Sequence, residues 1–128
     1  MPVARRQEED ERGMSASEAV GEHSWGWKVG LPLTRFHSPV EMFWRGLGYE
    51  LSWSQNTLTA HRDFDGQRRE CRIELRDGAD GVVEIHCRVR FGGRPTVQRP
   101  GEIYDPSELA RRMGESLSHG FGAPLREG

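Results

Sequence analysis

The sequence predicts an α+β domain, in which a twisted antiparallel sheet of four to five strands carries two helices on one face. Three observations predict this fold class. Apolar and polar residues alternate along several stretches, as they do in strands with one buried face. Apolar residues recur at helical spacing in two other stretches, each of which begins at a Ser-Pro or Asp-Pro pair. Turn signals separate the alternating stretches, so we expect hairpins and the element order β-α-β-β-β-β-α.

Length and composition favour a single domain and exclude a membrane-spanning protein. The chain has 128 residues, of which 34% are hydrophobic and 30% are charged, and its net charge is -2. No apolar run approaches the ~20 residues of a membrane-spanning helix, and no signal peptide is recognisable. Two cysteines are too few for a disulfide scaffold. We therefore expect a cytoplasmic protein that does not bind membranes.

The first part of the chain differs in composition from the rest. Residues 1–23 carry six acidic and three basic side chains and few apolar ones. Such a segment buries too little apolar surface to offset the entropy that is lost on ordering. We predict a disordered charged tail over residues 1–23 and a single α+β domain over residues 24–128.

A tryptophan-rich strand is predicted at the start of the domain. Every odd position from Trp25 to Leu33 is apolar, whereas the even positions from Ser24 to Pro32 are polar residues, glycine or proline. This period of two predicts one buried face. Because glycine and proline weaken pairing inside a sheet, we expect this strand to lie at an edge.

The first helix is predicted from its start signal. Ser38, Pro39 and Glu41 form a capping-box pattern before a helix over residues 39–47, and Gly48 is placed to end it in a left-handed conformation.

The second helix repeats the same device. Asp105 is the expected cap, Pro106 the first helical residue and Glu108 the third residue after the cap, and Gly120 is placed as the terminator. Each helix has one apolar stripe, so we expect both to pack on the same face of the sheet.

Four antiparallel strands are predicted in residues 49–91. Turn signals at residues 55–56, 65–66 and 77–81 divide this region, and pairing about each turn places the apolar residues on one common face. With the third turn centred on Ala79, Cys71 faces Cys87 and Glu74 faces Glu84. The predicted core face consists of Leu51, Trp53, Leu58, Ala60, Cys71, Ile73, Leu75, Val83, Ile85, Cys87, Val89 and Phe91.

No enzyme motif, cofactor motif or metal site emerges from the sequence. It contains no nucleophile elbow, phosphate-binding glycine loop or H-E-x-x-H pattern. The expected register places an arginine beside His61 and another beside His86, and these would repel a metal cation. The two thiols are expected to stay reduced and to pack as small apolar groups. We expect no cofactor and no metal, and the absence of motifs leans against an enzyme.

The first functional hypothesis is a non-catalytic protein-binding module, such as an adaptor, immunity protein or chaperone-like subunit, whose partner is another protein or a second copy. An aromatic edge strand combines unpaired backbone groups with large side chains that anchor interfaces. The Pro- and Gly-rich connection over residues 92–104 is long enough to bind a partner. The expected binding residues are Trp25, Trp27, Arg94, Arg99 and Tyr104. Burial of the two indoles in the core is an equally good interpretation.

Two alternatives remain open. The first is nucleic-acid binding by the outer face of the sheet, through Arg68, Arg72, Arg76, Arg88, Arg90 and His86. Alternating opposite charges and the scarcity of aromatic residues on that face favour a solvated surface instead. The second is a small-molecule site in a cavity between sheet and helices, lined by Trp44, Trp53 and Phe91. The element order resembles that of secretion-chaperone-like and helix-grip folds, a resemblance that transfers no function.

Overall fold

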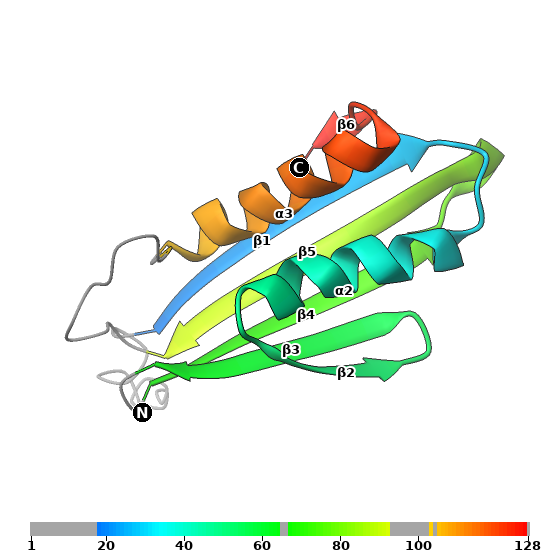
Figure 1. The fold of residues 1–128 in the computed structure, drawn as a ribbon. Coiled ribbons are helices and arrows are strands. Elements are labelled where there is room, and N and C mark those ends of the chain that lie inside the picture. Colours follow the sequence, from blue (N-terminus) through cyan, green and yellow to red (C-terminus); the bar gives the residue numbers. More distant parts are fainter. Residues whose placement is uncertain (1–17, 65–66, 93–102, 104, 128) are drawn as a thin grey trace, which may run out of the picture.

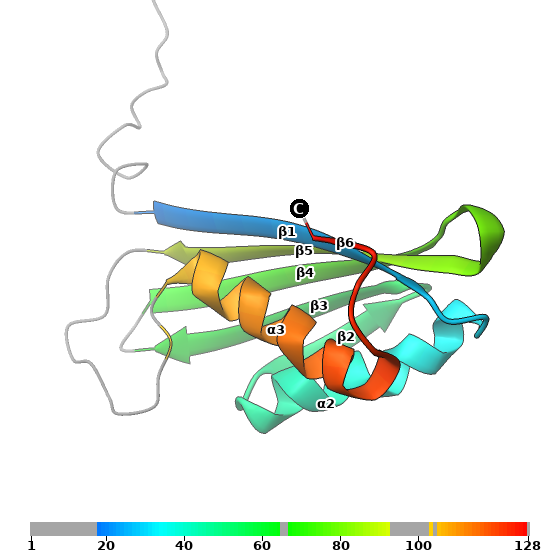
Figure 2. The same ribbon diagram turned by 90° about the horizontal axis from the view of Figure 1, so that it is seen from above.

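A computed structural model of the chain describes residues 18–64, 67–92, 103 and 105–127, and it confirms the α+β fold. Six antiparallel strands form one twisted sheet in the order β2-β3-β4-β5-β1-β6, with two α-helices on one face (Figures 1 and 2). The elements are β1 (Glu18–Lys28), α2 (His37–Gly46), β2 (Glu50–Ser54), β3 (Thr57–Phe64), β4 (Gln67–Asp77), β5 (Val82–Gly92), α3 (Pro106–Phe121) and β6 (Arg126–Glu127), with short 3-10 helices η1 (Leu33–Phe36) and η2 (Ala79–Gly81). The sixth strand is the two-residue β6, which the sequence did not predict.

The strand β1 begins earlier and ends earlier than expected. It starts at Glu18, so residues 18–23 of the predicted tail belong to the sheet, whereas residues 1–17 lie outside the described residues. It ends at Lys28 because Gly30 adopts a φ of 65° and the chain then turns into η1. Along its whole length β1 pairs with β5. Among the described residues, its other side pairs at Trp25 and Gly26, with β6, so the edge position that we predicted for β1 is taken by the two-residue β6.

The helix α2 begins without the predicted capping box. The 3-10 helix η1 leads directly into it, and the backbone N–H of His37 donates to the carbonyl of Thr34. The first turn therefore needs no side-chain cap. Glu41 instead accepts a hydrogen bond from the indole of Trp53, with 2.9 Å between Nε1 and Oε1. The predicted role of Gly48 is confirmed, since its φ is 87° directly after the helix.

The helix α3 begins as predicted and ends two residues later than predicted. The carboxylate of Asp105 accepts from the backbone N–H of Ser107 at 2.9 Å, and Pro106 is the first helical residue. Gly122, with a φ of 90°, takes the terminating position that we assigned to Gly120. In the part of the chain that the structure describes, no helix is long and apolar enough to span a membrane.

The register of the central hairpin differs from the prediction by two residues. Leu75 faces Ile85 rather than Val83, so Cys71 faces Val89 and Cys87 faces Ile73. The turn is centred on Asp80, because Asp80 and Gly81 both adopt positive φ, of 58° and 76°. A shift of two residues keeps every side chain on its predicted face, but it changes each cross-strand neighbour.

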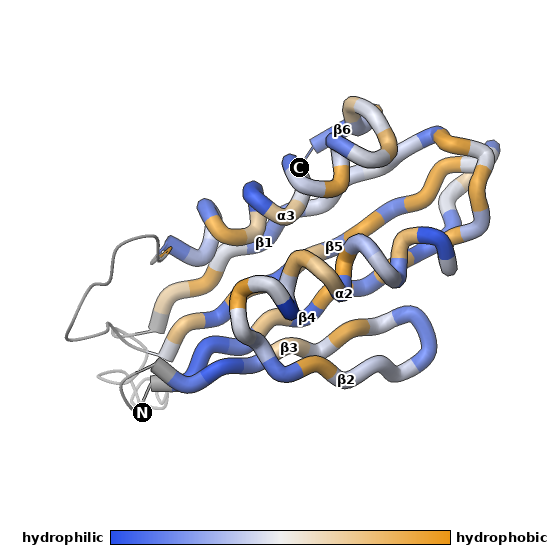
Figure 3. The backbone as a smooth tube through the Cα atoms, in the orientation of Figure 1, coloured by the Kyte–Doolittle hydropathy of each residue, from blue (hydrophilic) through white to orange (hydrophobic). Residues whose placement is uncertain are grey.

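The core lies between the sheet and the two helices, and the alternation of apolar and polar residues along the strands is visible in Figure 3. Leu51 and Trp53 are only half-buried, since β2 is the edge strand. The other predicted core residues are buried: Leu58, Ala60, Cys71, Ile73, Leu75, Val83, Ile85, Cys87, Val89 and Phe91.

Candidate functional site

The two tryptophans of β1 are core residues. The exposed fraction is 2% for Trp25 and 0% for Trp27. Their rings stack along the inner face of the sheet with centroids 6.4 Å apart, and Trp27 continues the row to Phe36. Neither indole is therefore available as an exposed anchor for a partner. Of the two interpretations that the sequence left open, burial in the core is the one observed.

Both indoles also attach the C-terminal segment to the sheet. Trp27 donates from Nε1 to the carbonyl of Gly122 at 2.9 Å, and Trp25 donates to the Glu127 carboxylate at 2.9 Å. These bonds give the polar edge of each indole a partner, which a buried indole N–H requires. The other predicted partner-binding residues, Arg94, Arg99 and Tyr104, lie outside the described residues.

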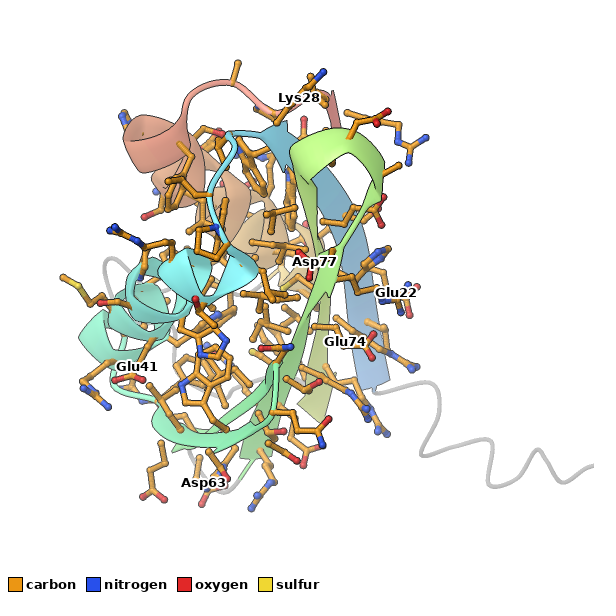
Figure 4. The ribbon with its side chains drawn as sticks, turned by 90° about the vertical axis from the view of Figure 1, so that its right-hand side faces the viewer. Glu22, Lys28, Glu41, Asp63, Glu74 and Asp77 are labelled. Atoms are coloured by element: carbon orange, nitrogen blue, oxygen red, sulfur yellow. The ribbon has the colours of Figure 1, made fainter. Side chains whose placement is uncertain are left out.

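The outer face of the sheet lies opposite both α-helices, and no helix of the described residues covers it (Figure 2). In Figure 4 the sheet is seen along its edge, with Glu22 and Glu74 projecting from the face opposite the helices and Glu41 on the helix side. The corrected register removes the contact between two glutamates that we expected there. Glu74 faces His86, and Glu84 faces Arg76.

The same register creates a pair of like charges. Arg72 on β4 lies directly opposite Arg88 on β5. The predicted register had paired Arg72 with His86, and Arg88 with Glu70. Arg90 is the next outward-facing residue along β5 and lies opposite Glu70. Like charges directly opposite each other destabilise a sheet, so this cluster is not explained by the stability of the fold.

Several arginines of the outer face are paired with carboxylates. Arg88 lies 3.2 Å from Glu22 of β1, and Arg68 lies 3.3 Å from Glu70. Arg76 donates to Glu74 at 2.8 Å, and this hydrogen bond lowers the pKa of the Glu74 carboxyl, with a smaller contribution from Arg72. Among the described residues no carboxylate forms a hydrogen bond or ion pair with Arg72 itself.

Two hollows meet at this arginine pair. The larger, of about 530 Å³, runs over β4, β5 and β1 and is lined by Glu22, His23, Ser24, Arg72, Glu74, Arg76, His86, Cys87 and Arg88. The smaller, of about 250 Å³, is lined by Thr59, Glu70, Cys71, Arg72, Arg88 and Arg90. Arg72 and Arg88 border both hollows, and they lie on β4 and β5, the two middle strands of the sheet order.

Sequence reasoning missed Glu22 as part of this site because it was placed in the tail. The signal was present, since the alternation of the tryptophan strand continues backwards through His23 and Gly21. Gly21 lies on the inner face, where a Cβ would be 2.4 Å from the backbone nitrogen of Ser107.

The expected register is also corrected at His86, whereas the row of His61 still ends at an arginine, which is Arg90 rather than Arg88. His86 has Glu74 and Ser24 as its cross-strand neighbours rather than an arginine, whereas His61 lies between Glu50 and Glu70. Within the residues described, no group of three or more His, Cys, Asp or Glu side chains is placed to hold a metal ion.

The two cysteines are separate buried thiols. Their exposed fractions are 1% for Cys71 and 2% for Cys87, and they are not bonded to each other. Burial raises the pKa of both thiols well above the usual value, and it also raises the pKa of Tyr49. Thiols that remain protonated in this way are poor nucleophiles.

The cavity expected between sheet and helices has no counterpart among the hollows described here. Trp44 and Phe91 are buried in the packed core. Trp53 is covered by His37, whose ring lies parallel to the indole with centroids 4.1 Å apart. A third hollow of about 530 Å³ lies beside α3 and the C-terminal segment, and none of these three aromatic residues lines it.

Comparisons with known proteins add no relative to this picture. The sequence matches no protein-family model, and a search of curated proteins gives no significant match.

Proposed function

We propose that this protein is a non-catalytic binding module that holds another polypeptide on the outer face of its sheet. The observation that carries the proposal is the opposition of Arg72 and Arg88 on a face that no helix covers. A carboxylate from a partner, placed between the two guanidinium groups, would relieve their repulsion and form charge-assisted hydrogen bonds with both.

The charge distribution favours a polypeptide over a nucleic acid. The outer face interleaves its arginines with Glu22, Glu70, Glu74 and Glu84, and these carboxylates would repel a phosphate backbone. No Phe, Tyr or Trp is among the described outward-facing residues of the strands, so base stacking has no platform there. A peptide with side chains of both signs can complement such a surface.

The hollows suit an extended chain. The two hollows that share Arg72 and Arg88 extend across β3, β4, β5 and β1, which is wider than a single small anion requires. Complementary charges would fix the position and direction of the peptide more than they would raise its affinity. The binding surface therefore moves from the tryptophan side chains, where the sequence suggested it, to the opposite face of the same sheet.

Selection of peptides tests this proposal. Random 12-residue peptides displayed on phage are selected on the full-length protein, with counter-selection on an Arg72→Gln/Arg88→Gln variant. We expect enrichment of peptides with Asp or Glu. Binding of these peptides should fall at least about 10-fold in the double variant, because each charge-assisted hydrogen bond contributes roughly 1.5–3 kcal/mol.

The control for this experiment is Arg112→Gln, which removes an exposed arginine from α3 on the helix side. It should leave peptide binding unchanged. Failure to select any peptide, or selected peptides that bind the double variant as well as the wild type, would reject the proposal. A single-stranded oligonucleotide that binds more tightly than every selected peptide would favour the nucleic-acid alternative.

A further inference from the structure

We propose that the open edge of β1, which is the side of residues 18–22 that faces away from β5, binds an extended segment of a partner polypeptide as an additional antiparallel strand. On this side β6 pairs with Trp25 and Gly26, and no strand of the described residues pairs with the stretch before them. The added strand would continue along β1 from the end of β6. The site is separate from the arginine pair of the outer face, so it goes beyond the proposed function and can hold or fail without it.

The backbone of β1 presents hydrogen-bonding groups along this edge. The carbonyl of Gly26 accepts a hydrogen bond from the backbone N–H of Leu125 at 2.6 Å, so the backbone groups of Gly26 point toward β6. In an antiparallel sheet, the backbone groups of every second residue point to the same side of the strand. The N–H and C=O groups of Glu18, Val20 and Glu22 therefore point away from β5, and each residue offers one donor and one acceptor to an added strand.

The open edge has few of the features that protect the edges of sheets. Its register with β5 is unbroken, so no bulge twists the edge away, and residues 18–24 contain no proline or lysine. Val20 is 43% exposed. Regular backbone groups beside an exposed apolar side chain favour the addition of a strand.

The helix α3 excludes a second copy of this chain as the antiparallel strand. It lies over β1 (Figures 1 and 2), since a Cβ at Gly21 would be 2.4 Å from the backbone nitrogen of Ser107 and a Cβ at Gly114 would be 2.3 Å from Trp25. Two copies paired antiparallel through β1 would bring their α3 helices about one strand spacing apart, or about 4.8 Å, whereas packed helices need about 8–10 Å. An extended segment carries no helix above it, so we assign the edge to a segment of another protein.

The inner side of the edge has space for side chains of such a segment. The hollow of about 530 Å³ beside α3 is lined by Trp25 and Glu127, where β6 ends, and by Arg111 of α3. Gly21 has no side chain, so it leaves the inner position opposite it to a large side chain of the partner. Aromatic residues opposite an edge glycine stabilise sheets in this way.

The outer side of the edge selects two further residues. A β-branched residue opposite Val20 would cover its exposed surface. A lysine or arginine opposite Glu22 would pair with its carboxylate, which is 64% exposed and retains acceptor capacity beside its 3.2 Å contact with Arg88. An acidic residue at that position would be repelled. From its N-terminus, the segment therefore has the pattern basic, aromatic, β-branched opposite Glu22, Gly21 and Val20.

Binding of a designed peptide to the full chain tests this site. The probe is acetyl-Thr-Lys-Phe-Val-Thr-Thr with a fluorescent label at its C-terminus, and its Lys, Phe and Val lie opposite Glu22, Gly21 and Val20. We expect fluorescence anisotropy to show saturable binding. N-methylation of the lysine amide removes an N–H that points to β1 and should weaken binding at least about 10-fold. The matched control is N-methylation of the phenylalanine amide, which points away from β1 and should leave binding nearly unchanged.

A charge exchange at Glu22 tests the register. Glu22→Lys should weaken binding of the probe by about 2- to 5-fold, as expected for one exposed ion pair. A peptide with Glu in place of its Lys should bind this variant more tightly than it binds the wild type. Arg72→Gln should bind the probe as the wild type does, because Arg72 lies on β4, two strands away. Loss of binding in Arg72→Gln would place the peptide on the outer face, which would overturn this inference and keep the proposed function.

Amide hydrogen exchange followed by nuclear magnetic resonance locates the added strand. In the free protein, the N–H groups of Val20 and Glu22 should exchange faster than those of Gly21 and His23, which point toward β5. Saturation with the probe should slow exchange at Val20 and Glu22 at least about 10-fold and leave α2 unchanged.

Four results would overturn the inference. The first is the absence of saturable binding, and the second is equal binding of the two N-methylated peptides. The third is slow exchange of Val20 and Glu22 in the free protein at every concentration, which would show that the edge is already covered. The fourth is slow exchange that is lost on dilution, which would assign the edge to a second copy of the chain.

Discussion

The indole of Trp25 lies directly on the backbone of Gly114 in α3. A Cβ built at Gly114 would approach the indole carbon Cε2 to 2.3 Å, which is closer than such atoms can lie. The helix therefore sits on β1 at a distance that only glycine permits, and the backbone at Gly114 covers part of the Trp25 indole. This contact helps to explain why Trp25 is buried although it lies near the end of the sheet order.

Replacement of Gly114 by alanine should separate α3 from the sheet. We expect Gly114→Ala to lower the free energy of unfolding by about 1–3 kcal/mol, because the added methyl group overpacks the contact with Trp25. Urea denaturation followed by tryptophan fluorescence measures the change.

The control is Gly120→Ala in the same helix, where a Cβ has no atom within 4 Å. This variant should be up to about 1 kcal/mol more stable than the wild type, since alanine is the better helix former. Equal stability of the two variants would contradict the packing argument.

A second pair of glycines tests how α3 contacts the start of β1. Gly21→Ala should lower the free energy of unfolding by about 1–3 kcal/mol, because its Cβ would be 2.4 Å from the backbone nitrogen of Ser107, and backbone cannot rotate away. Gly26→Ala on the same strand is the matched control. Its Cβ would have Val82 as its nearest neighbour at 3.4 Å, and its stability should be close to that of the wild type. Thermal unfolding followed by circular dichroism distinguishes the two outcomes.

Two outward-facing arginines of β4, Arg72 and Arg76, should differ in their contribution to stability. Arg76 donates to Glu74 and faces Glu84, so Arg76→Gln should lower the free energy of unfolding by about 0.2–1 kcal/mol at pH 7. Arg72 faces Arg88, so Arg72→Gln should cost less than Arg76→Gln or nothing. A larger cost for Arg72→Gln would mean that the arginine pair serves the fold rather than a ligand.

The acid side of the stability curve gives an independent check on Arg76. The hydrogen bond from Arg76 lowers the pKa of Glu74 in the folded protein. This bond therefore stabilises the fold fully above the pKa of a glutamate in the unfolded chain, which is about 4.3. It is lost as the pH falls through the folded pKa. The difference between the wild type and Arg76→Gln should therefore shrink as the pH decreases from 5 to 3, as measured by urea denaturation.

Alkaline pH should destabilise the protein through its thiols. Burial raises the pKa of Cys71 and Cys87 in the folded state. The free energy of unfolding therefore has its full value below the pKa of a thiol in the unfolded chain, which is about 8.5, and it decreases as the pH rises above that value. Each thiol contributes a decline of up to about 1.4 kcal/mol per pH unit. In Cys87→Ala the decline between pH 8.5 and 10 should be shallower, whereas the loss of packing should lower stability equally at every pH.

Thiol labelling provides the control for that prediction. In the native protein, a disulfide reagent should react with Cys71 and Cys87 only as fast as the protein unfolds, because both side chains are buried. Rapid labelling of either thiol at pH 8, without loss of structure, would contradict their protonated and inaccessible state.

Local sequence determined the faces of the strands and the start of one helix. The alternation along residues 49–91 placed ten of the core side chains correctly, because the side-chain period of a strand does not depend on where its partner begins. The cap at Asp105 followed from the same kind of local rule, since its carboxylate reaches a backbone N–H only two residues away. At Ser38 the local rule failed because a 3-10 helix already satisfied the backbone there.

The candidate site depended on information that local patterns do not carry. Which residues face each other across β4 and β5 was decided by the positive φ angles of Asp80 and Gly81, and a different turn with the same composition would place Arg72 beside His86. Whether Trp25 is exposed was decided by a glycine 89 positions away in the sequence, at Gly114, through close contact with α3. The sequence by itself determined which side chains point outward from the sheet, since that depends on period alone. Only the tertiary structure decided which of them meet, because cross-strand neighbours depend on the geometry of turns and on the packing of distant elements.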